Sequence, residues 1–74
     1  MFYVYVIERT KDDYLYIGYT ADLRRRFKEH SNGQKCRLVY YEAYFDKKTA
    51  QNREVKLKQF GGAWRSLKKR IEGN

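Results

Sequence analysis

The sequence predicts an α+β fold, in which helices pack against a small, mostly antiparallel three-stranded sheet. Three segments are rich in β-branched and aromatic residues, which indicates three strands. Three other segments have the composition or the apolar spacing of helices, and polar or glycine-containing stretches separate the segments. The predicted order is β-β-α-β-α-α. At 74 residues, the chain is expected to form one domain, residues 1–74.

The first two strands are expected to form a hairpin. Phe2–Glu8 and Tyr14–Tyr19 are the strands, and the sequence Thr-Lys-Asp-Asp at positions 10–13 is typical of a turn. Both faces of the first strand are largely apolar, which favours a central position in the sheet. In the second strand, Tyr16 and Gly18 are predicted to share one face.

The first helix is expected to follow this hairpin. It would begin at about Ala21 behind an N-cap at Thr20 and end near residues 31–33, where Gly33 suits a left-handed C-cap. Leu23 and Phe27 lie four residues apart and are expected to face a core.

The second half of the chain is predicted to add one strand and two helices. The third strand is Arg37–Phe45, and Asp46 is the N-cap of a helix from Lys47 to about Phe60. The glycines at 61 and 62 are expected to break that helix before a short third one, Ala63–Ile71. In that helix, three apolar residues are spaced for one face: Trp64, Leu67 and Ile71.

The charge balance points to a polyanionic partner. The chain has 17 Lys and Arg against nine Asp and Glu, a formal net charge of +8, and its basic residues occur in blocks. Such an excess favours nucleic acid, although a basic face kept for solubility and a surface for an acidic protein are alternatives. The residues expected to contact backbone phosphates are Arg24, Arg25, Lys28, Lys68, Lys69 and Arg70.

Several classes of protein are disfavoured. Cys36 is the only cysteine, so a disulfide scaffold is excluded within the chain and a cysteine-based zinc site is not expected. No apolar run approaches the roughly 20 residues that span a membrane, and the first residues lack the layout of a signal peptide. The expected location is therefore the cytoplasm, without contact to a membrane.

Two helical positions and one strand end carry residues suited to phosphodiester chemistry. Arg26 and His30 are four residues apart, on the flank next to the predicted core stripe of the first helix, and Tyr16 ends the second strand. In the second helix, Glu54 lies within the apolar face, where a buried carboxylate needs a cation, a metal or a network. An ion pair with Arg53 or Lys58 explains the position of Glu54 equally well.

The sequence Tyr3-Val4-Tyr5, followed by Tyr16-Ile17-Gly18, resembles the two motifs of the GIY-YIG nuclease superfamily. The resemblance extends over essentially the whole chain. It is strongest to the small stand-alone bacterial branch, which is related to the nuclease domain of the excinuclease of DNA repair. It implies a metal-dependent endonuclease that acts on DNA and recognises structure rather than sequence. It also implies Mg²⁺ or Mn²⁺ as the cofactor, with no other small-molecule cofactor.

Carried over residue by residue, the resemblance assigns five site residues. Tyr5 and Tyr16 match the motif tyrosines, and either can receive a proton from the attacking water. Arg26 matches the catalytic arginine, His30 stands where many members have a histidine, and Glu54 matches the metal-binding glutamate.

Two features depart from the family pattern. Tyr3 stands in place of the name-giving glycine, a change usual in this branch, and residues 31–35 replace a longer basic loop. Because that loop is expected to contact substrate, its shortening favours the alternative function, a nucleic-acid-binding module that does not cleave.

Overall fold

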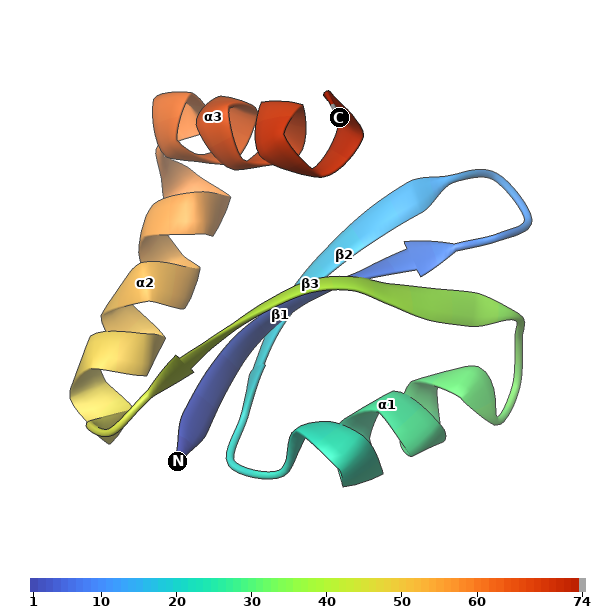
Figure 1. The fold of residues 1–74 in the computed structure, drawn as a ribbon, viewed down its shortest axis with the longest axis horizontal. Helices are drawn as coiled ribbons and strands as arrows, with labels where there is room; N and C mark the ends of the chain where they lie inside the picture. Colours follow the sequence, from blue (N-terminus) through green and yellow to red (C-terminus); the bar gives the residue numbers. More distant parts are fainter. Residues whose placement is uncertain (74) are drawn as a thin grey trace.

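The computed structural model describes residues 1–73 and has the predicted α+β order (Figure 1). Its elements are β1 (Phe2–Arg9), β2 (Tyr14–Thr20), α1 (Leu23–Ser31), β3 (Cys36–Tyr44), α2 (Lys47–Gln59) and α3 (Gly61–Glu72). The three strands form one sheet in the order β2-β1-β3, and β1 pairs antiparallel with both neighbours. Each strand limit lies within one residue of the predicted one.

β1 is the central strand, as its two apolar faces predicted. Val4, Tyr5, Val6 and Ile7 are all buried. Val4 and Val6 belong to the core beneath α2 and α3. Because side chains alternate along a strand, Tyr5 and Ile7 point to the opposite face, where α1 lies (Figure 1).

The hydrophobic core fills the space between the sheet and the two C-terminal helices. Ala50 and Leu57 from α2 and Leu67 from α3 are buried against Val4 and Val6. The predicted apolar stripe of α3 is confirmed, because Trp64 and Ile71 pack around this cluster. Phe60, which directly follows α2, is 59% exposed.

A polar network attaches α2 to the edge strand β3. The Glu42 carboxylate accepts hydrogen bonds from the hydroxyls of Tyr40 and Tyr44, and the Arg53 guanidinium donates to both of its oxygens at 3.0–3.3 Å. These hydrogen bonds hold the pKa of Glu42 below its usual range, although burial opposes the shift, while burial and Glu42 raise the pKa of Tyr44 to about 12.

α1 covers the other face of the sheet less closely. None of its residues is buried, and the expected core residues Leu23 and Phe27 are only half-buried. Its predicted start is also wrong, because Asp22 is the N-cap and accepts a hydrogen bond from the Arg25 N–H at 3.0 Å. The Thr20 hydroxyl instead accepts from the Asp22 N–H at 3.0 Å, which makes a turn between β2 and the helix.

The structure corrects two expectations about glycine. Gly33 is not a left-handed cap: within residues 1–73 no glycine has a positive φ, and Asn32 ends α1 in a right-handed conformation. Nor do the glycines at 61 and 62 separate the C-terminal helices. Phe60 does so with an extended backbone (φ −110°, ψ 102°), and its carbonyl accepts from the N–H of Ala63 at 3.0 Å. Both glycines therefore lie in the first turn of α3.

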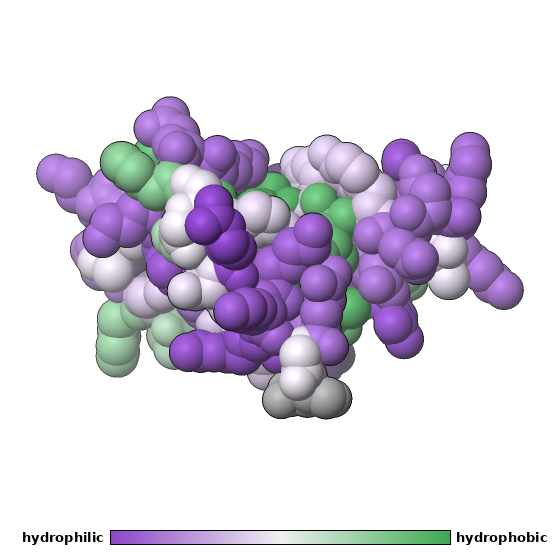
Figure 2. Space-filling model, turned by 90° about the horizontal axis from the view of Figure 1, so that it is seen from above, coloured by the Kyte–Doolittle hydropathy of each residue, from purple (hydrophilic) through white to green (hydrophobic). Residues whose placement is uncertain are grey.

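The face seen from above in Figure 2 is largely hydrophilic, and hydrophobic side chains are visible in small areas near its centre and at its left edge. Throughout residues 1–73, the helices are too short and too polar to cross a membrane.

Candidate active site

Three of the predicted site residues meet on the face of the sheet that α1 covers. The Tyr5 hydroxyl and His30 Nε2 are 3.2 Å apart and hydrogen-bonded. The Tyr16 ring lies 5.0 Å from the His30 ring and 6.4 Å from the Tyr5 ring, measured between centroids. One tyrosine from each strand of the hairpin and the histidine of α1 thus form one cluster.

Gly18 allows this arrangement. The pairing of β1 with β2 places Gly18 directly opposite Tyr5 and places Tyr16 opposite Ile7. A Cβ atom at position 18 would lie 2.2 Å from the Tyr5 hydroxyl oxygen, far inside van der Waals contact. The glycine of the second motif therefore leaves room for the tyrosine of the first motif to reach His30.

The Tyr5 hydroxyl is held in its neutral form. Burial and the neighbouring Tyr16 raise its pKa to about 12, whereas the positive charge of Arg26 lowers it and the negative charges of Glu54 and Glu29 raise it. The Arg26 guanidinium favours the phenolate, but burial outweighs it. The same interactions indicate that Arg26 and Glu54 lie within electrostatic range of the Tyr5 hydroxyl.

The three consecutive arginines of α1 have different surroundings. Arg25 and Arg26 both lie near Glu29, with Nε–carboxylate distances of 3.5 and 3.9 Å. Arg24 instead lines a cavity between α1 and the sheet. Helical geometry turns successive residues by about 100°, so the three side chains do not enter one site.

Glu54 makes one of the two ion pairs considered from the sequence. Its Oε2 lies 3.1 Å from Lys58 Nζ, and its side chain is 22% exposed. Arg53 is not available to it, because it pairs with Glu42. Within residues 1–73, no group of three or more His, Cys, Asp or Glu side chains is arranged to hold a metal ion.

Lys58, predicted only as a possible ion-pair partner of Glu54, also lies near the tyrosine–histidine cluster. Its ammonium lies 6.0 Å from the centre of the Tyr16 ring, in addition to its ion pair with Glu54. It therefore links the α2 carboxylate to the tyrosine–histidine cluster. The only signal in the sequence was its spacing of four residues from Glu54.

The predicted phosphate contacts do not form one surface. Arg24, Arg25 and Lys28 are on α1, whereas residues 68–70 are on α3, which packs on the opposite face of the sheet (Figure 1). Lys68 lines a shallow cavity near the start of β2, together with Trp64. Only the α1 set is on the same side of the sheet as Tyr5 and His30.

Small bacterial and archaeal proteins resemble this chain over most of its length. UPF0213 protein CPE1444 of Clostridium perfringens is 38% identical over 68 positions, which cover 80% of this chain and 72% of the relative. UPF0213 protein VNG_2274C of Halobacterium salinarum is 36% identical over 72 positions, covering 85% of this chain and 92% of the relative. No solved structure matches the chain significantly.

These comparisons also indicate that the chain is shorter than its relatives inside the matched region. Because 80% of 74 residues is about 59, about nine of the 68 positions shared with the Clostridium protein have no residue from this chain. The Halobacterium protein gives the same difference, since 85% of 74 residues is about 63 of 72 positions. The connection between α1 and β3 is only residues 32–35, in keeping with the short segment noted in the sequence.

The family comparison agrees with the geometry. Residues 1–69 match the family described as the GIY-YIG catalytic domain, and the match includes both tyrosine motifs, α1 and Glu54. The chain therefore belongs to the GIY-YIG family of nucleases.

Proposed function

We propose that this protein is an endonuclease that hydrolyses phosphodiester bonds in DNA with the help of Mg²⁺ or Mn²⁺, and that it selects DNA by structure rather than by sequence. The observation that supports the proposal is the cluster of Tyr5, Tyr16 and His30 on one face of the sheet, within electrostatic range of Arg26 and Glu54. This set provides a phosphate-binding cation, groups that exchange protons and a carboxylate.

Each side chain has a distinct task in this proposal. Arg26 binds the scissile phosphate and opposes the negative charge that grows in the transition state. Because the Tyr5 pKa is about 12, Tyr5 carries its proton at neutral pH and accepts another only after passing that proton on. Tyr5 can pass its proton to His30 Nε2, which lies 3.2 Å from the Tyr5 hydroxyl oxygen. The two residues therefore form a proton relay. Tyr16 is the second candidate for the base.

Glu54 would hold the metal ion. A single carboxylate suits Mg²⁺, which keeps several waters and shares its other positions with substrate oxygens. The bound ion would supply Lewis-acid activation of the phosphate. Since Lys58 pairs with Glu54, we propose that this lysine turns to the substrate phosphate when the ion binds.

The α1 basic residues complete the proposed DNA-binding surface. Arg25 and Lys28 are exposed on the helix that carries Arg26, so they can contact backbone phosphates on either side of the scissile one. The free thiol of Cys36 is in keeping with the reducing cytoplasm, where we place the protein.

Two observations favour the alternative, a DNA-binding module that does not cleave: the short connection between α1 and β3, and the ion pair of Glu54 with Lys58. The Glu54 carboxylate is already neutralised by Lys58, and within residues 1–73 no further acidic or histidine side chains join it in a metal-binding group. In that case the protein would bind DNA equally well with or without divalent metal.

A cleavage assay with one variant separates the two functions. Purified protein is incubated with branched, single-stranded and duplex DNA in Mg²⁺, Mn²⁺ or EDTA. Cleavage is expected only with metal, and Glu54→Gln is expected to lower it by at least about 100-fold, the scale of a lost catalytic Lewis acid. The melting temperature should change little, because Lys58, the cation left unpaired, is half-exposed. A Glu54→Gln protein that is destabilised and still cuts would contradict the metal-binding role.

A further inference from the structure

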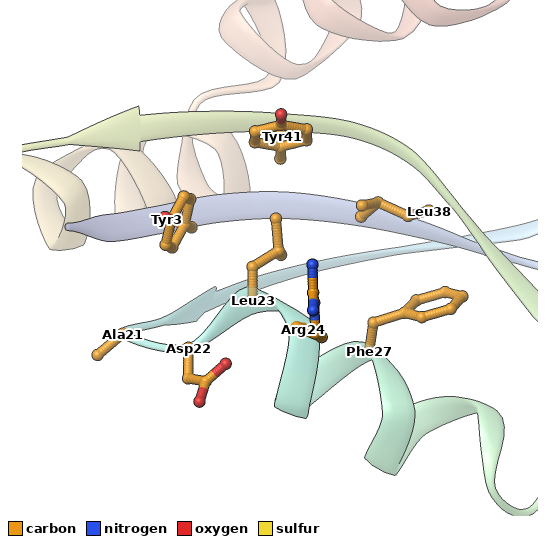
Figure 3. Close-up of a pocket in the computed structure, with 8 residues that line it drawn as sticks. All are labelled: Tyr3, Ala21, Asp22, Leu23, Arg24, Phe27, Leu38 and Tyr41. Atoms are coloured by element: carbon orange, nitrogen blue, oxygen red, sulfur yellow. The ribbon is translucent and has the colours of Figure 1, made fainter.

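A cavity outside the tyrosine–histidine cluster lies between α1 and the sheet. Its volume is about 510 Å³, within the range of small-ligand sites. Figure 3 shows Leu23 and Arg24 projecting from α1 towards the strands, with Tyr3, Tyr41 and Leu38 along β1 and β3. The cavity thus combines aromatic rings, aliphatic side chains and a guanidinium.

Tyr41 presents an aromatic surface to this cavity. It is 55% exposed, although it lies in the middle of β3. Tyr3 packs against it at an angle of 64°, with the ring centroids 6.2 Å apart. This contact orients the Tyr41 ring without covering it, so the ring is prepared to stack on a flat ligand.

Arg24 contributes a guanidinium to the cavity. Of the three α1 arginines, Arg25 and Arg26 share Glu29, whereas nothing within residues 1–73 makes a hydrogen bond or ion pair with the Arg24 side chain. Asp22 also lines the cavity, but its carboxylate accepts the Arg25 N–H at the start of α1. An anionic group is therefore the natural partner for Arg24.

The cavity lies close to the candidate active site. Tyr41 pairs with Tyr5 across β1 and β3, and Tyr5 also pairs with Gly18 on β2. Since adjacent strands are about 4.8 Å apart, β3 is about 10 Å from β2, which carries Tyr16. A DNA strand bound at Tyr5 and His30 can thus reach this cavity with a nearby nucleotide.

We propose that this cavity binds an unpaired nucleobase of the DNA substrate, which stacks on Tyr41 while Arg24 contacts a neighbouring phosphate. The inference rests on the proposed function, because it names the single-stranded region as the feature of DNA that the protein selects. Bases in a duplex are stacked on one another and do not present a free face to Tyr41. A second copy of the chain is a poorer occupant, because each copy carries a net charge of +8.

The test measures DNA affinity in EDTA, so that cleavage does not interfere. The probes are a single-stranded oligonucleotide containing 2-aminopurine, whose fluorescence is quenched by stacking, and a duplex of the same sequence. Tyr41→Ala is expected to weaken single-strand binding by roughly 5- to 100-fold and to remove the quenching, whereas duplex affinity stays within about twofold. Tyr41→Phe, which keeps the ring, should retain both.

Tyr14→Ala is the matched control, because Tyr14 is 56% exposed on the other edge strand and does not line this cavity. Single-strand binding by Tyr41→Ala at the wild-type level would overturn the proposal, as would an equal loss for both DNA forms. A dimer that dissociates in Tyr41→Ala would overturn it too, by identifying a second copy as the occupant.

The inference and the proposed function fail separately. A protein that cuts no DNA, but whose single-strand affinity depends on Tyr41, refutes the nuclease activity and supports the base-binding cavity. A protein that cuts DNA with metal, but whose single-strand affinity is unchanged in Tyr41→Ala, supports the nuclease activity and refutes the cavity.

Discussion

The two faces of the sheet carry different kinds of side chain. The face under α2 and α3 holds the buried apolar cluster and is closed at its edge by the Glu42–Arg53 network. The face under α1 has a tyrosine–histidine cluster and a cavity of about 510 Å³, and α1 itself has no buried residue. Most of the buried apolar side chains thus lie on one face and the tyrosine–histidine cluster lies on the other, with Glu54 and Lys58 of α2 near it. We therefore expect core substitutions to act mainly on stability and substitutions in the cluster to act mainly on activity.

Tyr5→Phe is expected to give the largest loss of activity without a loss of stability. It removes one hydroxyl and leaves the ring packed, so folding should be retained, while loss of a proton-transfer group should slow cleavage by at least about 100-fold. Single-turnover cleavage and a melting curve on the same preparation measure both effects. Tyr14→Phe, on an exposed tyrosine, is the control. If Tyr5→Phe and Tyr16→Phe both cut at the wild-type rate, tyrosine does not transfer the proton.

Leu57→Ala is expected to have the opposite effect, a loss of stability rather than of activity. Leu57 is 1% exposed in the core, and its truncation should lower the free energy of unfolding by about 2–5 kcal/mol. Leu23→Ala, the same change on half-buried α1, should lower it by about 1 kcal/mol. Urea denaturation measures both values. Equal losses would mean that α1 contributes as much to stability as the core does.

A smaller effect is expected where two α1 arginines are compared. Arg26→Lys keeps the charge but loses the planar guanidinium that binds phosphate through two hydrogen bonds, and we expect cleavage to fall by about 10- to 100-fold. Arg25→Lys should cost less, and Arg65→Lys on α3 should cost nothing. The measurement is kcat/KM on one DNA substrate. Similar losses from Arg25 and Arg26 would indicate a general basic surface instead of one catalytic arginine.

The smallest effect is expected in the pH dependence of stability. Tyr5 has a pKa of about 12 in the folded protein and about 10 when unfolded. Its contribution to stability is therefore complete below pH 10 and lost as the pH rises towards 12. Tyr44, on the other face, behaves alike, so Tyr5→Phe should reduce the alkaline loss without removing it. Thermal melts from pH 8 to 12 measure this, and identical curves for the wild type and Tyr5→Phe would show that Tyr5 has the same pKa in the folded and unfolded protein.

The fold was largely predictable because its signals are local. The apolar residues on both faces of β1 identified the central strand, and the capping role of Asp46 was correct, with its carboxylate accepting the Thr49 N–H at 2.9 Å. Helix starts were less predictable, since Thr20 and Asp22 are both good N-caps. Only the turn between these two residues determines which of them caps α1. At Gly61, no local pattern indicated that the preceding Phe60 would take the extended conformation instead.

The residues of the candidate site could be predicted from the sequence, but their surroundings in the fold could not. The motif tyrosines and His30 were expected together and lie together. The raised pKa of Tyr5 was not expected, because it depends on how completely α1 and β2 cover that ring. The contacts of Tyr41 with Tyr3 and of Lys58 with Tyr16 were not predicted, because these pairs are distant in sequence.

The central place of β1 has a consequence for the order of folding. The hairpin with β2 joins residues close in sequence, whereas the pairing with β3 joins Arg9 to Cys36 and Phe2 to Tyr44. During synthesis, β1 is made first and one of its edges stays open until the third strand emerges. A nascent chain that stops before β3 would present an unpaired, apolar strand, which is prone to aggregation. Pairing β1 with β3 closes the long chain segment between them, and this step should therefore limit the folding rate. The hairpin of β1 and β2 alone should not accumulate as a stable intermediate.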